Sequence, residues 1–227
     1  MLSDYQSLVP QLVRDDAGKI ATTDRDLAIT AMTRRYSKDR PRTKVEDVAA
    51  TAANELPLPT AWEADFSDVI GLEYPIGQVP PANLEQGRWA YYRKPSSIVI
   101  MLEDAIAVGG SVRVTYTASH LLDASNDTIP LADREPAACW AAALLCDQLA
   151  AFYSGSRDSS IQADSVNTQS RAQEYASRAK TLRKRYTDEL GVDDKRSEPA
   201  GTVVALPADS SWGRPGLLRP RRLPPTY

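Results

Sequence analysis

Apolar residues recur at helical spacing in the first forty residues of the chain. Between Ser3 and Gly18 the spacing predicts a helix that Ser3 caps, with one apolar face made of Tyr5, Leu8, Val9, Leu12 and Val13. A second helix is predicted from Thr23, which approximates a capping box with Asp26, to about Tyr36. Two amphipathic helices therefore open the sequence.

From residue 43 to about residue 122 short alternating and β-branched runs, separated by Pro and Gly, replace the helical pattern. We expect a β-rich insert with strands at residues 43–50, 69–74, 88–93, 97–102 and 111–117. Gly109 and Gly110 suit a turn between the last two strands, and residues 60–68 suit a short helix.

Helical pattern returns after Pro130. The run AACWAAALLC, followed by DQLAAFY, is apolar around nearly its whole circumference, and Pro136 suits the first turn of this helix. Such a helix must be buried on several sides, either by its own domain or by a neighbouring subunit. A last long helix is predicted over residues 164–190, and Gly191 ends it.

Beyond Gly191 the sequence has no periodicity and many prolines, which favour extended or polyproline II backbone. Its last sixteen residues contain arginines and apolar side chains but no acid. Two interpretations stay open: a segment that becomes ordered along a partner, or a solvated basic tail. For the first we expect docking by Trp212, Arg214, Leu217, Leu218, Arg219, Arg221, Arg222 and Tyr227.

These patterns predict an α+β protein. A helical bundle of about four helices carries an inserted small β-rich subdomain and an extended C-terminal tail. The expected parts are N-terminal helices at 1–42, the insert at 43–122, C-terminal helices at 123–191 and the tail at 192–227.

Composition narrows the class of protein. The chain has 227 residues, 42% of them hydrophobic and 25% charged, a balance typical of globular domains. A formal net charge of -3 predicts no bulk attraction to nucleic acid, so any such contact would be local. The first residues have no signal-peptide pattern and the most apolar run is about half a membrane span, so we expect synthesis in a reducing cytoplasm and no membrane contact.

Candidate chemistry is sparse. His120 is the sole histidine, follows a predicted strand, and is interpreted as a hydrogen-bonded structural residue. Cys139 and Cys146 stand seven apart on one predicted helix, about 10 Å by helical rise, too far to bridge, and suit buried small hydrophobic positions. With no phosphate-loop or metal-ligand spacing either, we expect no catalytic residue, metal or cofactor.

The last predicted helix carries a basic face. We expect subunit or DNA-channel contacts from Arg171, Arg178, Lys180 and Arg185. The alternative is an ordinary solvated helix face, which is common in an acidic protein.

Four stretches resemble the head-to-tail adaptor, or connector, proteins of tailed bacteriophages, also called head completion proteins. They are EYPIGQVPP at 73–81, VTYTASH at 114–120, TIPLADREPAACWAAALLCDQLAAFY at 128–153, and DSSIQADSVNTQSRAQEYASRAKTLRKRY at 158–186. An apolar helix, a polar SIQADSV connection and a helix ending RAKxLRKRY make the last two the most characteristic.

The resemblance implies a structural virion protein at the head–tail interface. It would form a ring, commonly twelvefold, beneath the portal protein, with residues 137–152 and 166–190 in the bundle and residues 212–227 docked on the portal. Expected partners are the portal, neck or tail proteins, further copies of the chain and, non-specifically, genomic DNA. Small adaptors of this type consist mainly of helices. The β insert would therefore be an addition to that helical fold. Alternatives are another neck or tail completion protein, a nucleic-acid-binding protein and, least supported, an enzyme.

Overall fold

Four α-helices form a bundle in the computed structural model, which describes residues 1–15, 18–155 and 164–192, and of residues 164–170 the helical backbone alone. They are α1 (Leu2–Val13), α2 (Thr22–Asp39), α3 (Arg134–Gly155) and α4 (Asp164–Leu190), with a short 3-10 helix, Leu131–Asp133, before α3. Residues Met1–Asp194 make one compact unit; the second, Lys195–Tyr227, lies outside the described residues. The α+β class is thereby confirmed.

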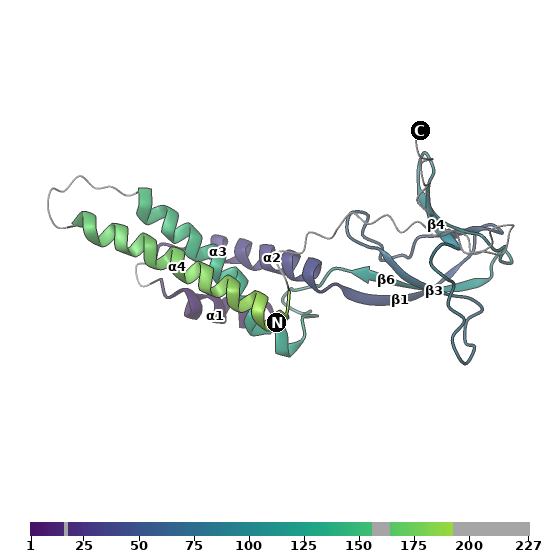
Figure 1. Ribbon diagram of the computed structural model, residues 1–227, viewed down its shortest axis with the longest axis horizontal. Helices are drawn as coiled ribbons and strands as arrows, with labels where there is room; N and C mark the ends of the chain where they lie inside the picture. Colours follow the sequence, from purple (N-terminus) through teal and green to yellow (C-terminus); the bar gives the residue numbers. More distant parts are fainter. Residues whose placement is uncertain (16–17, 156–163, 193–227) are drawn as a thin grey trace, which may run out of the picture. The chain divides into compact units, whose positions relative to one another are not determined.

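Helix α3 is the centre of the bundle, in contact with α1, α2 and α4 (Figure 1). Five of its eleven buried positions are alanine, including Ala137, Ala138 and Ala141, whose small side chains let neighbouring helices approach closely. The segment Leu131–Gly155 is long and apolar enough to cross a membrane, but 56% of its most apolar window is buried inside the chain's own structure. The sequence left open whether this helix is buried by its own domain or by a neighbouring subunit. In the structure, helices of the same chain bury it.

The other three helices each turn one apolar face toward α3, as their spacing predicts. The buried side chains are Tyr5, Val9 and Val13 of α1, Ala28, Ile29, Met32 and Tyr36 of α2, and Ala179, Leu182, Tyr186 and Leu190 of α4.

The ends of the first two helices differ from prediction. Helix α1 stops at Val13, short of Gly18, because Arg14 takes a left-handed conformation with φ of 52° and its N–H bonds to the Pro10 carbonyl at 2.9 Å. Ser3 lies inside α1, and Thr23 inside α2, whose first residue is Thr22, so neither caps its helix. In α4, by contrast, Gly191 follows the last helical residue with φ of 63°, as predicted.

Six strands between α2 and α3 form two antiparallel three-stranded sheets. One has the order β1 (Arg42–Ala49), β6 (Ser111–Ala118), β3 (Val69–Glu73); the other has β2 (Glu55–Pro57), β5 (Ile98–Leu102), β4 (Trp89–Arg93). Five match predicted strands within about a residue at each end, and β2, short and ending at a proline, was not predicted. In β1 and β6 the first and last residues of the insert pair, Arg42 opposite Ala118.

Two details of the insert correct the sequence-based expectations. Residues 60–68 form turns and no helix, because side-chain bonds hold this segment on the sheet: Thr60 donates to Glu46 at 2.8 Å, and Ser119 donates to Glu63 at 2.8 Å. Gly109 and Gly110 do lie in a turn, but β5 and β6 on its two sides belong to different sheets. A Cβ on Gly110 would lie 2.8 Å from the Ala107 carbonyl oxygen, so this position requires glycine.

The insert has a core of its own. Its buried side chains come from both sheets and include Leu56, Leu72, Ile100, Val114 and Tyr116. No residue belongs both to this cluster and to the buried cluster of the bundle. The two parts are therefore each stabilised by separate apolar burial.

His120 ties the end of β6 to the end of α2. Its ring Nε2 lies 2.9 Å from the Arg40 carbonyl oxygen, and its Nδ1 lies 3.0 Å from the Thr128 carbonyl oxygen and 3.1 Å from the Thr128 hydroxyl. Its backbone N–H donates to Ser37 Oγ at 2.9 Å. The ring also packs edge-on against Tyr36, with centroids 4.9 Å apart. The predicted structural role of this histidine is confirmed.

Replacing His120 by alanine removes the ring nitrogens that contact the Arg40 and Thr128 carbonyl oxygens, and the ring contact with Tyr36. We expect the free energy of unfolding in urea to fall by about 2–4 kcal/mol. Leu121→Ala, at the neighbouring half-exposed position, is the matched control and should cost below about 1 kcal/mol. Equal losses in the two variants would contradict a special role for the imidazole.

Burial raises the pKa of both the Cys139 and Cys146 thiols to about 11. At pH 8 both thiols are therefore protonated, with about one part in a thousand ionised. We expect no reaction of the native protein with Ellman's reagent at pH 8, and release of two equivalents of thionitrobenzoate in 6 M guanidinium chloride. Rapid labelling of the native protein would show that α3 opens locally.

Candidate interaction surface

The arginines on the predicted basic face of α4 have different partners in the two parts of the helix. In the C-terminal half, Arg185 donates to Glu135 of α3 and to Glu189, each at 2.6 Å, and these bonds, that to Glu189 first, raise the pKa of its guanidinium. Arg183 forms an ion pair with Asp147 of α3. The two arginines of this half are thus compensated within the chain, whereas Lys180 and Lys184 have no ion pair among the described residues.

In the N-terminal half of α4 the arginines lie over aromatic rings. Arg171 lies over Tyr153 and Arg178 over Tyr175, each with the guanidinium carbon 6.0 Å from the ring centroid. Arg178 also donates to the carbonyl of Val13, the last residue of α1, at 2.8 Å, which satisfies a helix-end acceptor. No ion pair to a carboxylate of the described residues is formed by either arginine.

A continuous series of ring contacts extends this half across three segments. Lys19, in the α1–α2 connection, lies 5.7 Å from the ring centroid of Phe152 on α3, and Phe152 packs edge-on against Tyr153 at 5.4 Å. Tyr153 stacks on Tyr175 of α4, with centroids 5.7 Å apart and the planes 4° from parallel. We call the set the basic aromatic strip; it comprises Arg14, Lys19, Phe152, Tyr153, Arg171, Tyr175 and Arg178.

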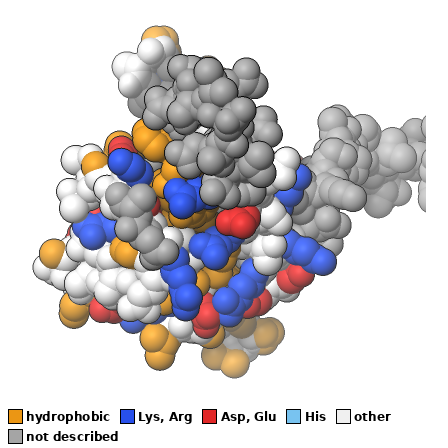
Figure 2. Space-filling model, turned by 90° about the vertical axis from the view of Figure 1, so that its left-hand side faces the viewer, with side chains coloured by type: hydrophobic (Ala, Val, Ile, Leu, Met, Phe, Trp, Pro, Cys, Tyr) orange, Lys and Arg blue, Asp and Glu red, His pale blue; other side chains and the backbone are white. Residues whose placement is uncertain are grey.

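The strip lies at the end of the bundle where α3 ends and α4 begins. Lys and Arg side chains gather around apolar ones on this end (Figure 2). Arg14 follows Val13 directly and is exposed, and Phe152 is 49% exposed, whereas Tyr153 is nearly buried beneath Arg171. The outer layer of the strip is therefore cationic and its inner layer aromatic.

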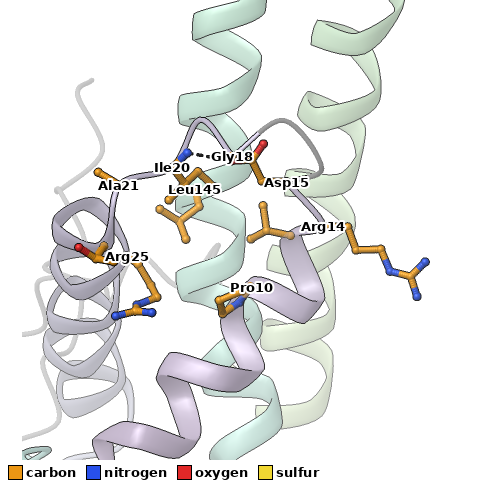
Figure 3. A pocket seen from close by; sticks show the side chains of 10 residues that line it. Pro10, Arg14, Asp15, Gly18, Ile20, Ala21, Arg25 and Leu145 are labelled. Carbon is orange, nitrogen blue, oxygen red and sulfur yellow. Dashed lines mark hydrogen bonds between the residues drawn. The ribbon is translucent and has the colours of Figure 1, made fainter.

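A cavity of about 360 Å³ adjoins the strip at the α1–α2 connection. Pro10, Val13, Ile20 and Leu145 supply its apolar walls, and Asp15 closes it by accepting the Ile20 N–H at 2.8 Å (Figure 3). The Arg14 side chain points away from this cavity, toward solvent (Figure 3).

A second cavity, of about 340 Å³, lies in the insert and is lined by Trp62, Tyr91, Arg93 and Ile98, among others. The Tyr91 hydroxyl donates to Asp68 at 2.6 Å and accepts the Val69 N–H at 2.8 Å. Burial and the Asp68 carboxylate raise the pKa of this phenol above its usual value, so it stays neutral and serves the fold.

The structure brings two of the four predicted contact residues, Arg171 and Arg178, into the strip. Lys180 is exposed without an ion pair among the described residues, and Arg185 is paired with carboxylates. The predicted contact roles of all four stay predictions. No group of three or more His, Cys, Asp or Glu that suits a metal occurs among the described residues. The predicted docking segment, residues 212–227, lies outside them.

Sequence analysis missed Arg14, Lys19 and Phe152. Lys19 and Phe152 are 133 positions apart, and nothing in their local sequence indicates contact. A basic residue at each end of a turn before a helix is too common a pattern to single out.

Comparisons with known proteins found little. No protein-family model matches the sequence, and no curated protein matches it. Among solved structures, a chain from the neck of a native GTA particle with C12 symmetry matches at 18% identity and a TM-score of 0.25, covering 75% of this chain and 89% of that one. A likeness at this level carries no argument about this protein.

The left-handed conformation of Arg14 costs free energy that glycine would avoid. We expect Arg14→Gly to raise the free energy of unfolding by about 1 kcal/mol, measured in urea. Arg14→Ala removes the same side chain but keeps the strained conformation, so it should give no stabilisation. Equal stabilisation by both variants would assign the effect to the loss of the side chain and contradict the backbone explanation.

Proposed function

We propose that this protein is a structural component of a tailed-bacteriophage neck, a head-to-tail adaptor that forms a ring, with twelve copies expected, beneath the portal. In this role it joins the DNA-filled head to neck or tail proteins and resides in the virion. The proposal rests on the sequence resemblance described above and on where the structure places the resembling stretches.

The observation that carries the proposal is the pairing of α3 with α4. The two most characteristic stretches, residues 128–153 and 158–186, supply these helices. They pack against each other in opposite directions, since Glu135 near the start of α3 contacts Arg185 near the end of α4, while Tyr153 contacts Tyr175. An apolar helix covered by a long basic helix is the arrangement that the resemblance implies for the bundle.

A third stretch, EYPIGQVPP, forms a projecting connection between β3 and β4. The side chain of Val79 in this connection is 97% exposed. An apolar residue presented on a projecting loop suits contact with another macromolecule better than binding of a small substrate. The β insert therefore offers a surface for a neck or tail protein.

A ring explains how weak contacts of this kind suffice. Each subunit would contribute a modest interaction, and joined copies add theirs by avidity. A docking segment at residues 212–227, ordered on the portal, would restrict assembly to heads that already carry a portal.

The proposal predicts that the purified chain binds isolated portal rings of the same virus in a pull-down. Deletion of residues 212–227 should abolish binding, because the docking arginines and apolar residues are lost. A variant with these sixteen residues in scrambled order keeps their charge and composition, so it should also fail if docking is specific.

Binding by the scrambled variant would show that charge alone suffices and would contradict a docking sequence. No binding by the complete chain would contradict the adaptor role and favour a component on the tail side of the neck. Pull-down against isolated tails then tests that alternative.

A further inference from the structure

We propose that the basic aromatic strip binds the phosphate backbone of duplex DNA, without reading base sequence. DNA contact by Arg171 and Arg178 is an expectation of the resemblance; the structure adds Arg14, Lys19 and the supporting rings, and the site is tested apart from the adaptor role. It lies on described residues of the bundle and is separate from the arginines of residues 212–227.

First, the basic side chains of the strip differ from several others of the bundle in their ion pairs. Three arginines elsewhere on the bundle have carboxylate partners: Arg183 with Asp147, Arg185 with Glu135, and Arg134 with Asp127. In the strip, Arg14, Lys19, Arg171 and Arg178 form no ion pair with a described carboxylate. Glu174, one turn from both Arg171 and Arg178, is exposed and pairs with neither. On a chain of net charge -3, four cations without a described carboxylate partner therefore lie together on this strip.

The second step is geometry. Arg171, Arg178 and Lys19 each lie over an aromatic ring, and the rings themselves are packed together. A guanidinium has five N–H donors, so one that lies over a ring keeps donors for a phosphate oxygen, even in Arg178, where Nη1 donates to the Val13 carbonyl. Because the rings hold these side chains in place, less side-chain entropy is lost when a phosphate binds.

The third step distinguishes DNA from an acidic protein. A protein partner needs apolar anchors, yet of the strip's rings Phe152 alone is well exposed, while Tyr153 is nearly buried. The strip's cations are spread over the α1–α2 connection and α4, and Arg14, Lys19, Arg171 and Arg178 are all exposed. A long, regular polyanion matches several separated cations on an open surface.

The experiment measures fluorescence anisotropy of a fluorescein-labelled 20-base-pair duplex with the complete chain, from 50 to 200 mM NaCl. The site variant is Lys19→Gln with Arg171→Gln. The matched control, Arg183→Gln with Arg185→Gln, removes the same number of charges from the compensated half of the surface. Arg14→Gly is a third variant, because it removes a strip charge while relieving backbone strain. Circular dichroism and thermal melting confirm that each variant is folded.

We expect salt-sensitive binding of the unaltered chain. The site variant should bind about tenfold more weakly at 50 mM NaCl, with the slope of log K against log salt reduced by about two. Arg14→Gly should weaken binding severalfold although the protein is no less stable, which excludes unfolding as the cause. The control should change affinity less than about twofold.

Three results would overturn the proposal: no binding at 50 mM NaCl, equal losses in the site and control variants, or unchanged binding in the site variant. Displacement by polyglutamate as effective as by unlabelled duplex at equal charge would assign the strip to an acidic protein and also overturn it. Portal binding is measured in a separate experiment. A failure of DNA binding therefore leaves the adaptor proposal standing, and a failure of portal binding leaves the DNA-binding proposal standing.

Discussion

Burial of α3 is the constraint on which the helical part of the structure depends. This helix has almost no polar side, so three neighbours must cover it, and its alanines let them approach closely enough to exclude water. The amphipathic faces of α1, α2 and α4 are matched to that requirement. Polar bonds, such as Arg178 to the end of α1, then fix the positions of helices already held by apolar contact.

The sequence predicted the helices and five of the six strands because periodicity reports burial directly. The prediction failed where an interaction other than apolar burial determined the local structure. The cap residues Ser3 and Thr23 have the right chemistry, yet the helices begin a residue earlier. Residues 60–68 have helical composition, but bonds from Thr60 and Ser119 to carboxylates hold them on the sheet. Strand β2 is too short to show alternation and exists through its pairing with β5.

The interaction surface was predicted less well than the fold. Sequence analysis identified a basic helix face but had no means of dividing it, because compensation depends on Asp147 and Glu135 of another helix. Arg171 and Arg178 have no such carboxylate partner among the described residues and lie over Tyr153 and Tyr175, although the compensated Arg183 also lies over a ring, that of Trp140. The charge pattern along one helix therefore shows which basic residues could bind a partner. Contacts with other helices determine which of these residues are not already used in ion pairs within the chain.

The pairing of Arg42 with Ala118 has a consequence for how the protein can vary. Paired residues on adjacent antiparallel strands lie about 5 Å apart, so the bundle meets the whole insert as if it were a short hairpin connection. The entropy cost of bringing the end of α2 near the chain that leads to α3 is therefore set by the pairing of β1 with β6. It does not depend on the length of the insert between these two strands. Since the insert also has a separate core, its sheets and projecting loops can be enlarged, replaced or removed while the helical framework keeps its stability.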